Sequence, residues 1–177
     1  MAPLIVVTGP PGAGKSTVSA LLAERFDRSA LVEGDAFFAF VKQGWVEPWL
    51  KESAEQNEVV IRAAAAAAGR LAAAGYTTVY DGVLGPWFLP AFVEATGLAS
   101  IDYAVLLPSE DECVRRVVTR QDHAFADESA TRKMHAEFAE AVIDERHVLR
   151  DVGEPEEVVD RILDVLPLGT LRVTPGQ

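Results

Sequence analysis

Scarce cysteine, the lack of a long apolar run and a shortage of positive charge set the first limits on this 177-residue chain. Cys113 is the single cysteine, so no disulfide can form within the chain, and a reducing compartment suits it. No apolar stretch approaches the ~20 residues that span a bilayer, and the first strand-like segment is too short for a signal-peptide core. These absences predict a cytoplasmic protein without a membrane partner.

The balance of charge argues against a further class of partner. The chain has 16 Lys and Arg against 27 Asp and Glu, a formal net charge of −11. A nucleic-acid partner would require a basic face, so we expect none. A zinc site is not supported either, because the 3 histidines and the one cysteine show no ligand spacing. We expect a monomer or homodimer that acts on a small molecule.

A glycine-rich segment near the N-terminus carries the clearest functional signal. It matches the pattern G-x-x-x-x-G-K-[ST], and all nine of its residues are expected to bind nucleotide: Gly9, Pro10, Pro11, Gly12, Ala13, Gly14, Lys15, Ser16 and Thr17. In such a loop the backbone N–H groups face phosphate oxygens, the lysine reaches the β- and γ-phosphates, and the serine hydroxyl ligates Mg²⁺. ATP and Mg²⁺ are therefore the expected cofactors, with Lys15 in a catalytic role.

Apolar strand-like runs alternate with helical patterns along the chain. Strands are expected at 4–8, 30–33, 77–80, 101–107 and 147–150. Helices are expected at about 15–26, 54–74, 87–94, 110–120, 129–145 and 155–166. This alternation predicts one α/β domain over residues 1–172, with helices on both faces of a parallel sheet, and a flexible tail at 173–177. Ligands of such sheets bind beyond the carboxyl ends of the strands.

Acidic residues end two of the expected strands, on the rim where the phosphates would lie. Glu33 and Asp35 are two residues apart, so an extended backbone would point both to one side. A hydroxyl that attacks a γ-phosphate needs a carboxylate to orient it and take its proton, and the metal needs another to hold its waters. We assign Asp35 as the base and Glu33 and Asp81 to the metal, while Asp81 stays open as an alternative base.

Arginines on the expected helix at 110–120 indicate a lid over the phosphates. Arg116 and Arg120 are four residues apart and share one helical face. An arginine on a mobile cover often stabilises the charge that departs in phosphoryl transfer. We expect both to bind the nucleotide, Arg120 to act catalytically, and the lid to cover about 120–140. Arg115 is interpreted as a solvated helix residue.

Taken together, these motifs resemble the small P-loop kinases that include gluconate kinase, shikimate kinase, chloramphenicol phosphotransferase and the zeta-toxin kinases. Glu33-Gly34-Asp35 resembles their acidic D-x-D, in which the first residue holds a metal-bound water and the second contacts the acceptor hydroxyl. The segment 116–123 resembles the lid of gluconate kinase. The resemblance implies a three-layer P-loop sandwich whose five parallel strands take the order 2-3-1-4-5, with a helical lid between strands four and five.

The chain also departs from that pattern. Glu33 replaces the first aspartate, Asp122 stands where gluconate kinase has glycine, and the sugar-acid contacts of that enzyme have no match. Gly44–Leu50 is similar to a tryptophan-rich segment of bacterial P-loop proteins of unassigned function. The resemblance therefore implies a kinase without implying its substrate.

Aromatic residues cluster after the two rim carboxylates and indicate where the acceptor binds. The candidate substrate residues are Asp35, Phe38, Trp45, Trp49, Arg62, Asp81 and Trp87. Because ligand pockets are mostly apolar with a few placed polar groups, they predict a neutral, partly apolar acceptor with a hydroxyl, such as a metabolite or an antibiotic. Core packing would explain any one of these aromatics equally well.

Other P-loop functions remain as alternatives. A GTPase switch would need an N-K-x-D motif, which the chain lacks. A nucleotide kinase would need several arginines around the acceptor phosphate, yet only Arg62 and Arg70 lie between strands two and three. A nucleoside or nucleotide kinase is the first alternative, and a non-catalytic nucleotide-dependent regulator is the second.

Overall fold

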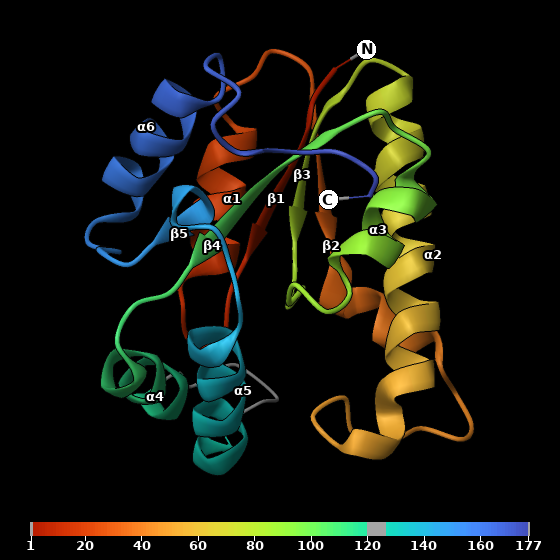
Figure 1. Ribbon diagram of the computed structural model, residues 1–177, viewed down its shortest axis with the longest axis vertical. Coiled ribbons are helices and arrows are strands. Elements are labelled where there is room, and N and C mark those ends of the chain that lie inside the picture. Colours follow the sequence, from red (N-terminus) through yellow and green to blue (C-terminus); the bar gives the residue numbers. More distant parts are fainter. Residues whose placement is uncertain (1, 120–126, 177) are drawn as a thin grey trace.

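A central sheet lies between two layers of helices in the computed structural model, which describes residues 2–119 and 127–176 (Figure 1). The strands are β1 (Leu4–Thr8), β2 (Ser29–Glu33), β3 (Thr77–Asp81), β4 (Ile101–Leu106), β5 (Val148–Leu149) and β6 (Arg172–Val173). The α-helices are α1 (Lys15–Ala23), α2 (Ala54–Ala73), α3 (Leu89–Thr96), α4 (Glu110–Thr119), α5 (Glu128–Glu140) and α6 (Pro155–Val165). Three 3₁₀ segments, η1 (Gly34–Phe40), η2 (Lys51–Ser53) and η3 (Glu145–His147), join them.

The sheet has the expected strand order and one additional strand. Parallel pairing runs β2-β3-β1-β4-β5, which confirms the order 2-3-1-4-5. β6 adds an antiparallel pair with β4, in which Val173 faces Ile101. Val173 is buried, so the prediction that a flexible tail begins at this residue is wrong. A strand of two residues has no periodicity from which it could have been predicted.

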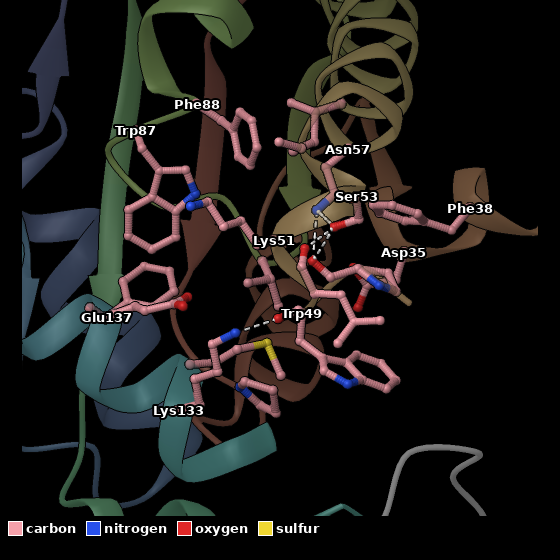
Figure 2. A pocket seen from close by; sticks show the side chains of 18 of the residues that line it. Asp35, Phe38, Trp49, Lys51, Ser53, Asn57, Trp87, Phe88, Lys133 and Glu137 are labelled. Atoms are coloured by element: carbon pink, nitrogen blue, oxygen red, sulfur yellow. Dashed lines mark hydrogen bonds between the residues drawn. The ribbon is translucent and has the colours of Figure 1, made fainter. Parts of the chain in front are cut away.

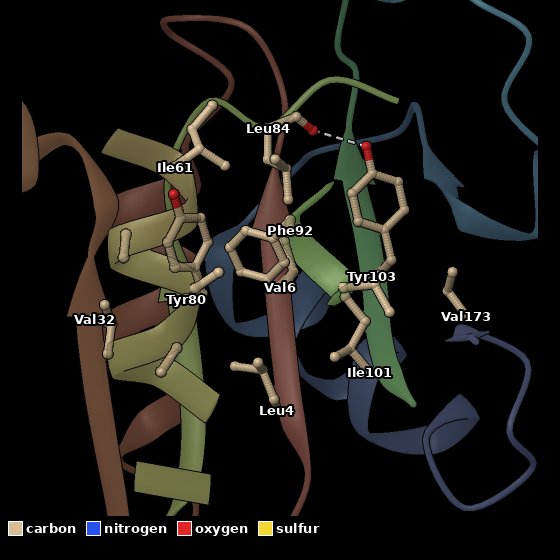
Figure 3. Close-up of a cluster of buried hydrophobic side chains, with 14 of the residues drawn as sticks. Leu4, Val6, Val32, Ile61, Tyr80, Leu84, Phe92, Ile101, Tyr103 and Val173 are labelled. Atoms are coloured by element: carbon tan, nitrogen blue, oxygen red, sulfur yellow. Dashed lines mark hydrogen bonds between the residues drawn. The ribbon is translucent and has the colours of Figure 1, made fainter. Parts of the chain in front are cut away.

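Strand alternation divides the core into two halves. Leu4 and Val6 of β1 face the side covered by α2 and α3, whereas Ile5 and Val7 face the side covered by α1 and α6 (Figure 1). Figure 3 shows the first of these clusters, which also holds Tyr80, Phe92 and Tyr103. Every residue of β1 is buried, which explains why this strand is a continuous apolar run.

The alanine-rich helix α2 packs closely against α3. Ala64, Ala65 and Ala68 are fully buried. Gly69 lies so near the end of α3 that a Cβ there would stand 2.1 Å from the carbonyl oxygen of Thr96. Small side chains thus let the two helices approach, and the low-complexity run has a packing role. No helix within the described residues combines the length and the hydrophobicity that crossing a bilayer requires.

Several expected element ends differ from the structure. α1 ends at Ala23 instead of 26, α5 ends at Glu140 instead of 145, and α3 begins only at Leu89. Trp87 and Phe88 therefore precede α3 on a loop that faces the carboxyl end of the sheet. β5 is limited to Val148–Leu149, because the chain before it forms η3.

Candidate active site

The glycine-rich loop between β1 and α1 has a backbone that only glycine tolerates at key positions. Gly9 and Gly12 have φ angles of 142° and 80°. A Cβ on Gly9 would lie 2.1 Å from the carbonyl oxygen of Leu106, and one on Gly12 would lie 2.2 Å from that of Cys113. The loop is therefore pressed against the end of β4 and against α4. α1 begins at Lys15, so its N-terminal N–H groups open onto the concave side of the loop.

Three polar side chains meet at this loop. Lys15 is 8% exposed, and its Nζ donates to the carbonyl oxygen of Pro10 at 3.1 Å, which folds it back over the loop. Ser16 donates a hydrogen bond to Asp81 at the end of β3. Burial raises the pKa of Asp81, while the Ser16 hydrogen bond and the Lys15 charge oppose that rise. A cation bound next to Asp81 would therefore favour the charged form of this buried carboxylate.

The three carboxylates expected at the rim, Glu33, Asp35 and Asp81, do come together. The backbone geometry that brings Glu33 and Asp35 near each other differs from the one expected. Glu33 and Asp81 are register partners on β2 and β3. Asp35 instead lies in η1, because the extended backbone ends at Glu33 and turns at Gly34. The argument that spacing of two in a strand aligns Glu33 with Asp35 is therefore wrong. The charges of Asp35 and Glu33 nevertheless act on Asp81 and help to raise its pKa.

The residues at this point fit a magnesium ion that is held mainly through a nucleotide. Oδ1 of Asp81 is buried and has no hydrogen-bond partner among the described residues. Across the same residues, no three His, Cys, Asp or Glu side chains gather closely enough to hold a metal alone. Mg²⁺ commonly takes one or two protein oxygens together with phosphates and water. Ser16 and Asp81, with Glu33 behind them, would supply those oxygens, and the ion would neutralise phosphate charge.

A large cavity of about 1060 Å³ opens beside the phosphate loop. Pro11, Gly12, Lys15, Ser16 and Asp35 line one end of it. Beyond them the walls carry six aromatic side chains: Phe38, Trp45, Trp49, Trp87, Phe88 and Phe138. The cavity thus joins the glycine-rich loop to a mainly apolar chamber. No arginine is found among the described residues that line it.

One wall of the cavity is a loop that α2 holds in place. Gln56 accepts from the backbone N of Val46 at 2.9 Å and donates to its carbonyl oxygen at 2.7 Å. Asn57 donates to the carbonyl oxygen of Pro48 at 2.7 Å and to Oγ of Ser53 at 2.9 Å. These bonds fix the segment 45–50 that carries two of the tryptophans, so this wall is preformed.

The opposite wall comes from α5 and from the loop before α3. Lys133 Nζ donates to the carbonyl oxygen of Trp49 at 2.6 Å and joins α5 to the tryptophan loop (Figure 2). The Trp87 and Phe138 rings are 5.5 Å apart. Gly85 permits this placement, because a Cβ there would lie 2.2 Å from the Trp87 ring. In Figure 2 the Glu137 carboxylate points into the space between these walls.

A smaller hollow of about 310 Å³ lies on the far side of the phosphate loop. Its lining residues are Gly14, Thr17, Val18, Arg116, Val152, Gly153, Glu154 and Pro155. Arg116 Nη2 donates to the carbonyl oxygen of Val152 at 3.3 Å, and its Nη1 lies 3.4 Å from that of Ala13. Glu112 accepts from Arg116 Nε at 2.7 Å and holds the guanidinium in place. The hollow therefore adjoins the phosphate loop and is bordered by one guanidinium group.

Most of the expected site residues that the structure describes meet around these two spaces, but Arg62 does not. Asp35, Phe38, Trp45, Trp49 and Trp87 all line the large cavity. Arg62 was expected to contact the substrate but is paired instead with Glu58 and Glu94 and does not line the cavity. Arg120, the expected lid arginine, lies outside the described residues, as does the lid segment 120–126. Arg115 is exposed and paired with Glu112, as expected of a solvated residue.

Sequence reasoning missed several residues of the cavity. They are Lys51, Ser53, Asn57, Lys133, Glu137 and Phe138. Lys133 and Glu137 are four residues apart within the segment expected to form a lid, so they share one face of α5. That spacing could have identified them. Lys51 and Ser53 belong to a short 3₁₀ turn that has no sequence pattern.

Comparison with known proteins agrees with this arrangement. Residues 5–138 match a family described as an AAA domain. The chain belongs to this AAA domain family. The matched residues include the phosphate loop, the three rim carboxylates Glu33, Asp35 and Asp81, and almost all of α5. None of the curated proteins compared with the chain matches it.

Solved structures similar to this AAA domain protein are small P-loop proteins. A sugar kinase from Janibacter sp. HTCC2649 is 23% identical, with a TM-score of 0.74 and coverage of 96% of this chain and 97% of that one. The Deinococcus radiodurans tunicamycin resistance protein is 15% identical, with a TM-score of 0.66 and 96% coverage of both chains. A gluconokinase from Sinorhizobium meliloti 1021 is 21% identical, with a TM-score of 0.65 and coverage of 94% and 92%. These likenesses establish a fold like that of small-molecule P-loop kinases.

Proposed function

We propose that the protein is an ATP-dependent kinase that transfers the γ-phosphate to a hydroxyl of a neutral, partly apolar acceptor. The observation that carries the proposal is the continuity of one cavity, from Lys15 and Ser16 past Asp35 into a chamber walled by six aromatic side chains. A phosphate donor bound on the loop would present its γ-phosphate at the mouth of that chamber. The sugar kinase and gluconokinase folds support the same class of reaction.

In this proposal each group at the rim has one task. Lys15 and the loop N–H groups hold the phosphates, and Ser16, Asp81 and Glu33 hold Mg²⁺ and its waters. Asp35 orients the acceptor hydroxyl and takes its proton as the oxygen attacks phosphorus. The base of ATP lies in the hollow beside Arg116. The bond from the γ-phosphorus to the β–γ bridging oxygen breaks, and ADP leaves with that oxygen.

The acceptor is inferred from what lines the chamber. Arginine is the side chain best suited to bidentate binding of carboxylate and phosphate groups. The described lining has none, and Arg62 is turned toward Glu94. Those facts favour a neutral glycoside, nucleoside-like compound or antibiotic over a sugar acid or a nucleoside monophosphate. A fold similar to that of a tunicamycin resistance protein is compatible with an antibiotic acceptor.

A coupled ADP-release assay over a panel of acceptors tests the proposal. The panel should hold neutral glycosides, nucleosides, hydroxylated antibiotics, sugar acids and nucleoside monophosphates, with Mg·ATP as donor. We expect acceptor-dependent ADP release in the first three groups, and a loss of orders of magnitude for Lys15→Ala with its fold intact. Preference for a sugar acid or a nucleoside monophosphate would overturn the proposal that the acceptor is neutral. Full turnover by folded Lys15→Ala would overturn the kinase.

A further inference from the structure

Two tyrosines occupy matching places in the core below the active rim, but only one has a partner for its hydroxyl. Tyr80 of β3 is 2% exposed and Tyr103 of β4 is 1% exposed. Both hydroxyls point toward the carboxyl end of the sheet (Figure 3). Tyr103 donates to the carbonyl oxygen of Leu84 at 2.8 Å. The Tyr80 hydroxyl forms no hydrogen bond with the residues that the structure describes. Because the Tyr80 ring is buried, its hydroxyl is a donor held in a fixed place near the rim.

The Tyr80 hydroxyl lies between the two turns that carry the rim aspartates. A Cβ on Gly34, which precedes Asp35, would lie 2.2 Å from that oxygen. A Cβ on Gly82, which follows Asp81, would lie 2.9 Å from it. The two glycines therefore leave space that the phenol fills. The hydroxyl therefore lies close to the backbone of the turns that carry Asp35 and Asp81.

Of the two aspartates, Asp35 is the one that this hydroxyl can serve. Asp81 follows Tyr80 directly in β3, so their side chains leave opposite faces of the strand. Asp81 also has a hydrogen bond from Ser16. Asp35 lies across the gap on η1, lines the cavity, and has no hydrogen-bond partner within the described residues. A tyrosine hydroxyl is a neutral donor at neutral pH and can serve a carboxylate acceptor.

We propose that Tyr80 is a positioning residue that donates a hydrogen bond from its hydroxyl to the Asp35 carboxylate when the site is occupied. This rests on the proposed function, in which Asp35 is the base. Hydrogen bonds at catalytic groups are often long or misaligned in empty sites and tighten with ligands bound. A donor from below would hold one carboxylate oxygen and leave the other directed at the acceptor hydroxyl.

The kinetic test compares Tyr80→Phe with Tyr103→Phe, using the acceptor that the panel identifies. Each variant loses one buried hydroxyl, and Tyr103→Phe also breaks a known hydrogen bond. Because a hydrogen bond to a charged group is strong, Tyr80→Phe should lower kcat about tenfold to a hundredfold and leave the KM for ATP within about twofold. Tyr103→Phe should lower Tm but not kcat. Equal kcat for Tyr80→Phe and wild type would overturn the proposal.

A double-mutant cycle decides whether Tyr80 acts through Asp35. In an Asp35→Asn background the residual transfer rate should fall less than about twofold on adding Tyr80→Phe, since the carboxylate that it positions is gone. A full additive loss would show that Tyr80 acts elsewhere and would overturn the proposal.

A measurement without turnover separates this proposal from the kinase assignment. Tyrosine labelled with ¹³C at Cζ gives one signal for each of the 3 tyrosines, which Tyr→Phe variants assign. With Mg·AMP-PCP bound, Asp35→Asn should shift the Tyr80 signal and leave that of Tyr103 in place. If no acceptor is phosphorylated yet this shift occurs, the function fails and the contact stands. If the Tyr80 signal does not move, the contact fails whatever the enzyme does.

Discussion

Glu33 and Asp81 stand directly opposite each other as register partners on neighbouring parallel strands. Residues paired in this way project from the same face of a sheet, so two carboxylates from segments 48 positions apart meet beside Ser16. Their surroundings differ, because Asp81 is 8% exposed whereas Glu33 is open to solvent. An unpaired buried carboxylate has more to gain from a cation than a solvated one.

This difference predicts unequal effects on metal use. Asp81→Asn should raise the Mg²⁺ concentration needed for half-maximal activity by about tenfold or more, and Glu33→Gln by clearly less. The measurement is a magnesium titration at fixed ATP for both variants. A larger effect from Glu33→Gln would reverse the assignment of the main metal contact.

Adjacent arginines on α4 offer a matched test of the nucleotide site. Arg116 contacts the carbonyl oxygens of the phosphate loop and of Val152, whereas the Arg115 side chain bonds to Glu112 alone among the described residues. Arg116→Ala should weaken ATP binding by about tenfold, and Arg115→Ala should leave it unchanged. Calorimetric titration of both variants with ATP measures this. Equal affinities in the two variants would remove Arg116 from the nucleotide site.

The sequence predicted the sheet and the phosphate end of the site much better than the acceptor end. Continuous apolar strands, alternating helices and a glycine loop whose backbone needs positive φ angles are local signals. The position of Arg62 is not local. Its orientation depends on Glu94 of α3, 32 residues away, so the sequence could not show that it turns from the cavity. Lys51 and Asn57 were missed for the same reason. Lys51 is placed by the short 3₁₀ segment η2, and Asn57 by its hydrogen bond to the carbonyl oxygen of Pro48.

The aromatic side chains of the cavity should affect the KM for the acceptor and not the binding of the nucleotide. Trp45 and Trp87 line the cavity and are 44% and 47% exposed. Covering such a side chain with an apolar ligand stabilises the complex enough that Trp45→Ala or Trp87→Ala should raise the acceptor KM about tenfold to a hundredfold. Phe40 is the control, because it is an exposed aromatic of η1 that does not line the cavity. A Phe40→Ala variant with the same rise would mean that the tryptophans act through folding alone.

Two hydrogen bonds join the Gln56 side chain to the Val46 backbone. They predict that acceptor binding depends on Gln56, although Gln56 does not line the cavity. Gln56→Ala removes both bonds to the Val46 backbone, so the loop that carries Trp45 loses its fixed position. The acceptor KM should rise about threefold to tenfold with an unchanged KM for ATP. Glu55→Ala, at the exposed neighbouring position, should change neither constant. An increase in both KM values for Gln56→Ala would indicate general loosening of the fold.

Asp102 on β4 predicts how stability depends on pH, away from the site. Its side chain is buried, Oδ1 has no partner among the described residues, and burial raises its pKa above the ordinary 3.8 although Arg172 opposes this. The unfolded chain therefore releases this proton at lower pH than the folded protein does. As pH rises from about 4 through the raised pKa, ionisation of Asp102 lowers the free energy of unfolding.

Asp102→Asn removes that ionisation and should stabilise the protein only where Asp102 is charged. We expect its Tm to exceed that of wild type by about 2–4 °C at pH 7.5 and the difference to vanish near pH 4. Thermal unfolding from pH 4 to 8 measures this, with the exposed Asp164→Asn as control. A lower Tm at neutral pH would mean that attraction between Asp102 and Arg172 outweighs the cost of burying the charge. The partnerless Oδ1 is the reason to expect the opposite sign, because no hydrogen bond within the described chain compensates the hydration that this oxygen loses.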